Sequence, residues 1–268
     1  MTTRVITVAN QKGGVGKTTS TVNIAAAIAQ AGHRVLVIDM DPQGNASTAL
    51  GAVHHEGTPS VYEVLSGELG LADVMQECPD IPGLWTAPAT IDLAGAEIEL
   101  VAQVAREYRL TRAIDTLLAA EHFDIVFLDC PPSLGLLTLN GLVAAREVLL
   151  PIQCEYYALE GLSQLLRTID MVRTHLNPGL RVSAILLTMY DGRTRLASQV
   201  ADEVRTHFGA QVLDTVIPRS VRVSEAPSYS QSVVTYDPTS SGAIAYREAA
   251  AQVLALAPST ELSTDISY

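Results

Sequence analysis

The sequence contains only two lysines, Lys12 and Lys17, and both lie in the segment KGGVGKTT of residues 12–19. The glycines of this segment let successive backbone N–H groups curl around phosphate oxygens, because glycine carries no Cβ. In such a loop Lys17 contacts the β- and γ-phosphates of a nucleotide, and the Thr18 hydroxyl completes a magnesium site. The segment therefore predicts a phosphate-binding loop, or P-loop, made of Lys12, Gly13, Gly14, Val15, Gly16, Lys17, Thr18 and Thr19.

The flanking sequence fits this chemistry. Residues 4–9 form a short β-rich run, and residues 18–31 form an alanine-rich helical stretch. A strand, a glycine loop and a helix N-terminus direct amides and the positive end of the helix dipole at an anion. The alternative is a glycine turn that only connects a strand to a helix. We favour the nucleotide site because a second cation, Lys12, would offset charge in a phosphoryl-transfer transition state.

Two further apolar runs end in aspartate. Residues 34–38 precede Asp39 and Asp41, and residues 125–128 precede Asp129. This pattern is typical of the Walker B motif, in which the carboxylate orients magnesium, usually through water. A strand-terminal aspartate is often only the N-cap of the next helix, but the P-loop upstream favours the metal. We expect Asp39 and Asp129 to form the metal shell with Thr18, and Asp41 to position the attacking water.

The composition bounds the remaining possibilities. The chain has 268 residues, of which 48% are hydrophobic, so it can bury one large core. Its cysteines, Cys78, Cys130 and Cys154, are too few and too scattered for a disulfide framework or a zinc site, which fits a reducing compartment. The sequence shows no signal peptide and no apolar run of the roughly 18 residues that span a bilayer. We therefore expect a soluble, cytoplasmic protein with no membrane partner.

Strands and helices alternate along the chain. Apolar runs suited to buried parallel strands recur at residues 34–38, 125–128, 148–152, 182–188 and 212–217. Helical periodicity is found at residues 94–120, 162–176 and 243–256. This alternation predicts an α/β fold with a single doubly wound, mostly parallel twisted sheet, helices on both faces and ligands at the carboxyl ends of the strands. We expect one P-loop domain over residues 1–257 and a disordered polar tail over residues 258–268.

These motifs together resemble a known family. The chain is similar to the ParA/Soj-type ATPases that partition chromosomes or plasmids, in the ParA/MinD branch of P-loop proteins. Its P-loop resembles their deviant Walker A motif, K-G-G-x-G-K-[ST], whose first lysine is the signature lysine. Similar stretches occupy residues 10–19, 39–45, 93–100, 129–135, 153–161 and 216–222.

The resemblance implies a mechanism. ATP and Mg²⁺ would lie between the two subunits of a homodimer, and Lys12 would contact the phosphates bound by the neighbouring subunit. The dimer would bind double-stranded DNA nonspecifically on the nucleoid, and a ParB-type centromere-binding partner would release it by stimulating ATP hydrolysis. The resemblance places the adenine base near Pro218, Arg219 and Ser220, with Ser220 where the family usually has asparagine.

The charge distribution bears on DNA binding. The net charge of −12 is the wrong overall sign for a nucleic-acid binder. Between residues 181 and 222, however, the sequence contains six arginines and only four acidic residues. One basic face on an acidic body can bind DNA phosphates weakly and in a salt-sensitive manner. The alternative is that these are ordinary solvated arginines. The candidate DNA contacts are Arg193, Arg195, Arg219 and Arg222.

Two other function classes share the P-loop variant. A MinD-like cell-division regulator, recruited to a membrane surface, needs a basic amphipathic helix at its C-terminus, and residues 258–268 contain no basic residue. A relative of the nitrogenase iron protein needs two cysteines per subunit for a shared iron–sulfur cluster. We interpret Cys130 as buried packing, so we prefer the partitioning ATPase.

Overall fold

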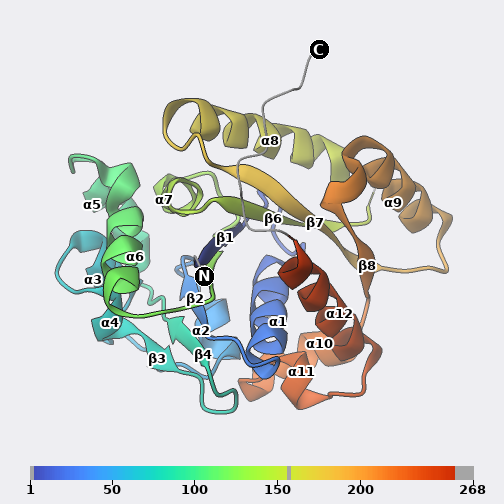
Figure 1. Ribbon diagram of the computed structural model, residues 1–268, viewed down its shortest axis with the longest axis horizontal. Coiled ribbons are helices and arrows are strands. Elements are labelled where there is room, and N and C mark those ends of the chain that lie inside the picture. Colours follow the sequence, from blue (N-terminus) through green and yellow to red (C-terminus); the bar gives the residue numbers. More distant parts are fainter. Residues whose placement is uncertain (1–2, 156–157, 257–268) are drawn as a thin grey trace.

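Eight strands form one sheet through the centre of the molecule (Figure 1). The computed structural model describes residues 3–155 and 158–256. Within them the strand order is β3-β4-β2-β5-β1-β6-β7-β8, and only the β3–β4 pair is antiparallel. The strands are β1 (Arg4–Val8), β2 (Val35–Asp39), β3 (Gln76–Glu77), β4 (Leu84–Ala87), β5 (Ile125–Asp129), β6 (Glu147–Gln153), β7 (Arg181–Tyr190) and β8 (Val212–Pro218). The predicted fold class is confirmed, and each predicted strand is present to within two residues.

Helices cover both faces of the sheet, because side chains alternate along each strand. In β2, Leu36 and Ile38 pack into one hydrophobic core while Val35 and Val37 pack into the other. The first core lies under α3 (Val61–Ser66), α4 (Leu71–Val74), α5 (Leu93–Leu100), α6 (Arg109–Ala120), α7 (Leu136–Ala144), α8 (Ala158–His175) and α9 (Arg195–Phe208). The second lies under α1 (Lys17–Gln30), α2 (Asn45–Ala49), α10 (Val221–Glu225), α11 (Val233–Tyr236) and α12 (Ser241–Ala255). Figure 1 shows α7 and α8 above the sheet and α1 and α12 below it.

The expectation of one helical segment over residues 94–120 is wrong. The helix stops at Leu100 and resumes, through a short 3-10 turn, as α6. Ala105, between them, has a left-handed φ of 51°. Asn140 of α7 supports the break, because its amide donates to the Arg106 carbonyl at 3.0 Å and its oxygen accepts from Leu110 N–H at 3.2 Å. A side chain distant in the sequence therefore caps the start of α6, and local periodicity carries no sign of it.

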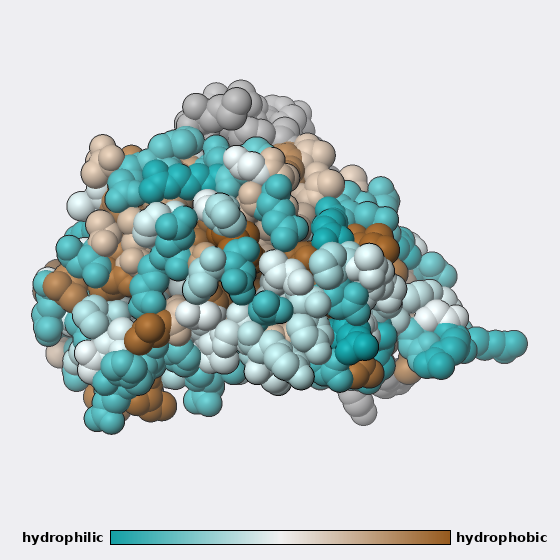
Figure 2. Space-filling model, turned by 90° about the horizontal axis from the view of Figure 1, so that it is seen from below, coloured by the Kyte–Doolittle hydropathy of each residue, from teal (hydrophilic) through white to brown (hydrophobic). Residues whose placement is uncertain are grey.

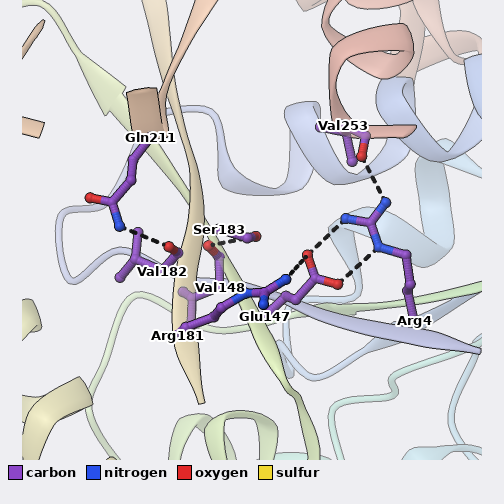
Figure 3. Close-up of polar contacts among 8 residues, drawn as sticks. All are labelled: Arg4, Glu147, Val148, Arg181, Val182, Ser183, Gln211 and Val253. Atoms are coloured by element: carbon purple, nitrogen blue, oxygen red, sulfur yellow. Dashed lines mark hydrogen bonds and ion pairs between the residues drawn. The ribbon is translucent and has the colours of Figure 1, made fainter. Parts of the chain in front are cut away.

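A buried ion pair ties the amino ends of the strands to the last helix (Figure 3). Arg4 of β1 donates to both carboxylate oxygens of Glu147 of β6, at 2.9 and 2.7 Å. It also donates to the carbonyl of Val253 in α12 at 2.7 Å. Arg181 of β7 approaches the same carboxylate at 4.0 Å. These contacts lie at the edge opposite to the P-loop and hold three strands and α12 together. The predicted tail, residues 258–268, lies outside the described residues.

Candidate nucleotide-binding site

The P-loop joins β1 to α1 and turns at its glycines. Gly14 and Gly16 have φ angles of 74° and 86°, in the left-handed region that favours glycine. Lys17 starts α1 and is only 6% exposed. Its Nζ donates to the carbonyl oxygen of Lys12 at 3.2 Å. Burial lowers the pKa of Lys17, while the carboxylates of Asp129 and Asp41 act in the opposite direction.

A cavity of about 540 Å³ opens beside the P-loop, within the range typical of small-molecule sites. Its lining combines Gly13, Gly14 and Gly16 to Thr19 of the loop with the segment after β2, where Asp41, Gln43 and Asn45 lie. The far wall comes from Met189 at the end of β7 and from residues that follow β5 and β8. Parallel strands thus bring several sequence-distant loops to one edge of the sheet, as expected for a doubly wound fold.

The segment expected to bind the base lies beside the P-loop. A smaller hollow of about 130 Å³ is lined by Pro218, Arg219 and Ser220, and it shares Gly16 and Met189 with the larger cavity. Met189, at the end of β7, has a left-handed φ of 50°. This conformation is costly for a residue with a side chain and is typical of functional sites.

The carboxylates that end β2 and β5, Asp39 and Asp129, lie side by side on neighbouring strands but accept hydrogen bonds from different partners. Asp129 accepts hydrogen bonds from the hydroxyls of Thr18 and Thr21, at 2.7 and 2.9 Å. Asp39 accepts from both Ser47 N–H and Ser47 Oγ, at 2.8 and 2.7 Å. Both carboxyls are fully buried, and burial raises the pKa of each. The charge of Asp39 further raises the pKa of Asp129.

These residues fit a magnesium ion bound mainly by phosphates and water. Thr18 lines the cavity and its hydroxyl is bonded to Asp129, which places a hard oxygen donor and an anion where Mg²⁺ is expected. Among residues 3–155 and 158–256, no group of three or more histidines, cysteines or acids could hold a metal by itself. Asp41 lines the cavity, whereas Asp39 is turned towards Ser47.

Lys12 does not share the environment of Lys17. Its side chain is 43% exposed, and its Nζ forms an ion pair with Glu155 Oε2 at 2.8 Å. Lys12 is also absent from the lining of the cavity. Sequence reasoning did not find Glu155 as its partner, although the segment 153–161 was among the stretches that resembled the family.

The four candidate DNA contacts lie near the ends of β7 and β8. Arg193 pairs with Asp191 at 2.9 Å, and Arg222 pairs with Glu225 at 3.1 Å. Arg193 holds the pKa of Asp191 down to about 2, mainly through its hydrogen bonds. Arg195 begins α9, and Arg219 lines the smaller hollow. The four arginines are therefore grouped, but two of them have acidic neighbours that reduce the local positive charge.

Several lining residues were not predicted individually. Gln43 and Asn45 lie in the DMDPQGN stretch, so that motif could have indicated them. Val223, Pro227 and Gln231 carry no local signal of nucleotide contact. They reach the cavity only because the chain after β8 folds back across the P-loop.

Comparison with known proteins decides the family. A family model described as an AAA domain matches residues 3–182. Soj of Bacillus subtilis (strain 168), a sporulation initiation inhibitor protein, is 49% identical over 252 residues, which cover 94% of this chain and 98% of Soj. The chromosome partitioning protein ParA of Caulobacter vibrioides (strain NA1000 / CB15N) is 50% identical over 251 residues, 94% of each chain. The chain belongs to the ParA/Soj family of chromosome-partitioning ATPases.

A solved structure supports the same ParA/Soj fold. A Mycobacterium smegmatis protein described as cobyrinic acid a,c-diamide synthase, with bound ADP and magnesium, is 43% identical. It superposes with a TM-score of 0.81 and covers 94% of each chain. The resemblance drawn from the sequence is thereby confirmed at the level of the family and the fold.

Proposed function

We propose that this ParA/Soj family member is an ATP-dependent switch for DNA partitioning. Its ATP-bound form is a homodimer that encloses nucleotide and Mg²⁺ between the subunits and binds double-stranded DNA nonspecifically. A ParB-type partner stimulates ATP hydrolysis, and the dimer then leaves the DNA. In the cell the protein acts in the cytoplasm, on the nucleoid. The name of the Caulobacter vibrioides relative at 50% identity, chromosome partitioning protein ParA, supports the partitioning role.

One geometric observation supports the dimer in particular. Lys17 is buried in its own cavity, but the ammonium of Lys12 is exposed and pairs with Glu155 instead. A cation held outside its own cavity can contact the phosphates of a nucleotide that is bound by a second subunit. There it would offset charge that develops during phosphoryl transfer.

The roles of the remaining residues follow from their positions. Thr18 and Asp129 would hold Mg²⁺, which neutralises charge on the β- and γ-phosphates when bound. Asp41 lines the cavity and would orient the attacking water. Asp39 is bonded to Asp41 N–H at 3.1 Å and to Ser47, so it would act on the metal only through water while positioning Asp41. Pro218, Arg219 and Ser220 would contact the base.

The test is ATP turnover with and without double-stranded DNA and a ParB-type protein. We expect slow turnover alone and faster turnover with both. Asp41→Ala should still bind ATP and dimerise, but its hydrolysis should slow by roughly 100-fold or more, since a positioned acid or base contributes about that factor. The variant should therefore stay on DNA. Unchanged single-turnover hydrolysis in Asp41→Ala would remove this residue from the reaction.

The MinD-like alternative depends on residues 258–268, which lie outside the described part of the chain. Within residues 3–155 and 158–256, no helix is both long and apolar enough to cross a membrane. All three cysteines are buried, and Cys130 lies wholly within the first core, so the iron–sulfur alternative has no exposed ligands.

A further inference from the structure

The loop between Asp129 and α7 is held by a residue from another part of the chain. Asp129 ends β5, and Pro132, three residues later, lines the nucleotide cavity. Helix α7 begins directly after Gly135, which has no side chain to accept from the first N–H groups of the helix. Glu97 of α5 lies at this point, and its Oε1 accepts from Leu137 N–H at 3.4 Å. An acid from a different helix therefore takes the place of the missing N-cap.

The glycine at position 135 makes room for this carboxylate. Gly135 has a φ angle of −74°, which any residue can adopt, so the backbone conformation does not require glycine. A Cβ at this position would instead collide with Glu97 Oε1. The Glu97 carboxylate therefore packs directly on the backbone of Gly135, and only a residue without a side chain leaves that space open.

The charge of Glu97 also suits the start of α7. The first N–H groups of a helix have no backbone partner, and the positive end of the helix dipole lies beside them. Helix α7 has no acidic residue in its own first turn. The hydrogen bond to Leu137 is long, so the interaction of the carboxylate with the helix dipole adds to its effect.

Glu97 faces the protein on a helix that exposes apolar side chains. Ile98 of α5 is 79% exposed, whereas Glu97 is half-buried. Figure 2 shows hydrophobic side chains at the left end of the molecule, the end where Figure 1 places α3 to α6. A surface helix ordinarily directs its acids to water and its apolar residues inward. The reverse arrangement here means that Glu97 is not an ordinary solvated acid.

We infer that Glu97 is a positioning residue for ATP hydrolysis. By capping α7 from α5, its carboxylate fixes the loop that places Pro132 in the cavity wall, directly after Asp129. The Thr138 hydroxyl of α7 donates to the Ser133 carbonyl at 2.7 Å, so the start of α7 and the loop are held as one unit. The inference rests on the proposed function, because it assigns Glu97 a role in the reaction of that site.

Substitutions on both sides of the contact test the inference. Glu97→Ala removes the carboxylate, and Gly135→Ala expels it. Each should slow single-turnover ATP hydrolysis, measured with DNA and a ParB-type protein, by at least about threefold, because a lost helix cap loosens the loop by about that factor. Binding of a fluorescent ADP analogue should stay within about twofold of the wild type. The double variant should be no slower than either single variant, because both substitutions remove the same contact.

The matched control is Glu99→Ala in the same helix. Glu99 accepts from the Tyr62 hydroxyl of α3 at 2.9 Å, so this variant loses a bond of α5 but keeps the cap of α7. It should hydrolyse ATP as the wild type does.

A cap supplied within α7 should restore the rate. Gly135 has the extended conformation of a common N-cap residue, with a ψ angle of −171°. Glu97→Ala combined with Gly135→Ser should therefore recover hydrolysis, whereas Glu97→Ala combined with Gly135→Ala should not. A merely structural cap would lower the melting temperature without changing the rate of the folded protein. An unchanged rate in Glu97→Ala, at a temperature where it is folded, overturns the inference.

Hydrogen–deuterium exchange measures the loop without hydrolysis. With ADP and Mg²⁺ bound, amides of residues 130–138 should exchange about fivefold faster in Glu97→Ala and Gly135→Ala than in the wild type or Glu99→Ala. If the wild type hydrolyses ATP but the exchange is equal in all four proteins, only the assignment of Glu97 is wrong. If the wild type hydrolyses no ATP, the proposed function is wrong and the inference falls with it.

Discussion

Lys12 and Lys17 are five residues apart in one loop, yet the fold gives them opposite environments. Lys17 is buried beside Asp129 and Asp41, whereas Lys12 reaches outward to Glu155. A hydrogen bond links the two residues, because the Lys17 ammonium donates to the backbone carbonyl oxygen of Lys12. In the proposed dimer, Lys17 therefore contacts the phosphates bound by its own subunit, and Lys12 contacts those bound by the other subunit.

Lys17→Ala should weaken nucleotide binding by roughly 10- to 100-fold, because it removes a charge-assisted contact in a buried site. Lys12→Ala should bind nucleotide nearly as the wild type does but lose ATP-dependent dimerisation. Titration of a fluorescent nucleotide and sedimentation separate the two effects. Glu155→Gln is the control, since it breaks the Lys12 ion pair but keeps the lysine, and it should still dimerise. Normal dimerisation of Lys12→Ala would contradict the assignment across the interface.

The buried Asp129 carboxyl makes stability depend on pH. Its pKa is raised from 3.8 to about 7, so the folded state binds more protons than the unfolded state between these values. Stability of the metal-free protein therefore falls as pH rises through this window and levels off above pH 7. Asp129→Asn removes the carboxyl whose deprotonation lowers the stability of the folded protein. The variant should therefore be more stable than the wild type by more than about 1 kcal/mol at pH 8, and by less at pH 5. Urea denaturation in EDTA at both pH values checks this, and an equal effect at both would contradict it.

At the scale of elements, a buried ion pair between Arg4 and Glu147 lies at the edge of the sheet opposite to the cavity. Glu147 is 2% exposed and Arg4 10%, and the pair joins β1, β6 and α12. Burying two charges is costly, but removing one alone leaves the other uncompensated. This contact therefore stabilises the packing of α12 only as long as both partners are present.

Glu147→Ala should lower the free energy of unfolding by about 3–5 kcal/mol, the usual effect of breaking a buried pair. The matched control is Asp170→Ala in α8, which breaks an exposed pair with Arg173 and should change stability by less than about 1 kcal/mol. Urea denaturation of both variants gives the comparison. A loss below about 1 kcal/mol for Glu147→Ala would mean that the pair does not hold α12.

Sequence reasoning recovered the elements whose signals are local. The P-loop, the apolar strands and the aspartates that end β2 and β5 have fixed spacings, and the parallel sheet follows from their alternation. The short strands β3 and β4 and the helices α2, α3, α4, α7, α9, α10 and α11 were not predicted, and α5 and α6 were merged. The boundary between those helices depends on Asn140, and the cavity wall at Gln231 depends on the return of the chain after β8. Such features arise from tertiary contacts that no local pattern encodes.

At the scale of the whole molecule, DNA can bind only where a local group of arginines outweighs the net negative charge of the chain. Arg193, Arg195, Arg219 and Arg222 lie near the ends of β7 and β8, but Asp191 and Glu225 pair with two of them. Each monomer should therefore bind DNA weakly. A dimer would present the group twice, and avidity would then make binding depend on nucleotide.

Replacing any of these four arginines by alanine should weaken DNA binding similarly on every sequence, because phosphate contacts carry no base information. Each lost phosphate contact should flatten the log–log salt dependence by roughly 1, and by up to about 2 in a dimer. A biosensor titration across salt concentrations measures both quantities. Arg112→Ala in α6, at the other end of the sheet, is the control. If all four variants keep the wild-type slope, the DNA-binding face lies elsewhere.

The scarcity of lysine has a chemical consequence. The chain has two lysine ε-amines, and only that of Lys12 is exposed to a substantial degree. An acylating reagent that attacks primary amines will therefore modify the side chain of Lys12 before any other. Most proteins scatter such modification over many side chains, but here acylation of side chains is concentrated on Lys12, beside that of the α-amino group at the N-terminus. In the proposed dimer, acylation of Lys12 should prevent ATP-dependent dimerisation, and the extent of acylation should report how well the second subunit shields the ε-amine of Lys12.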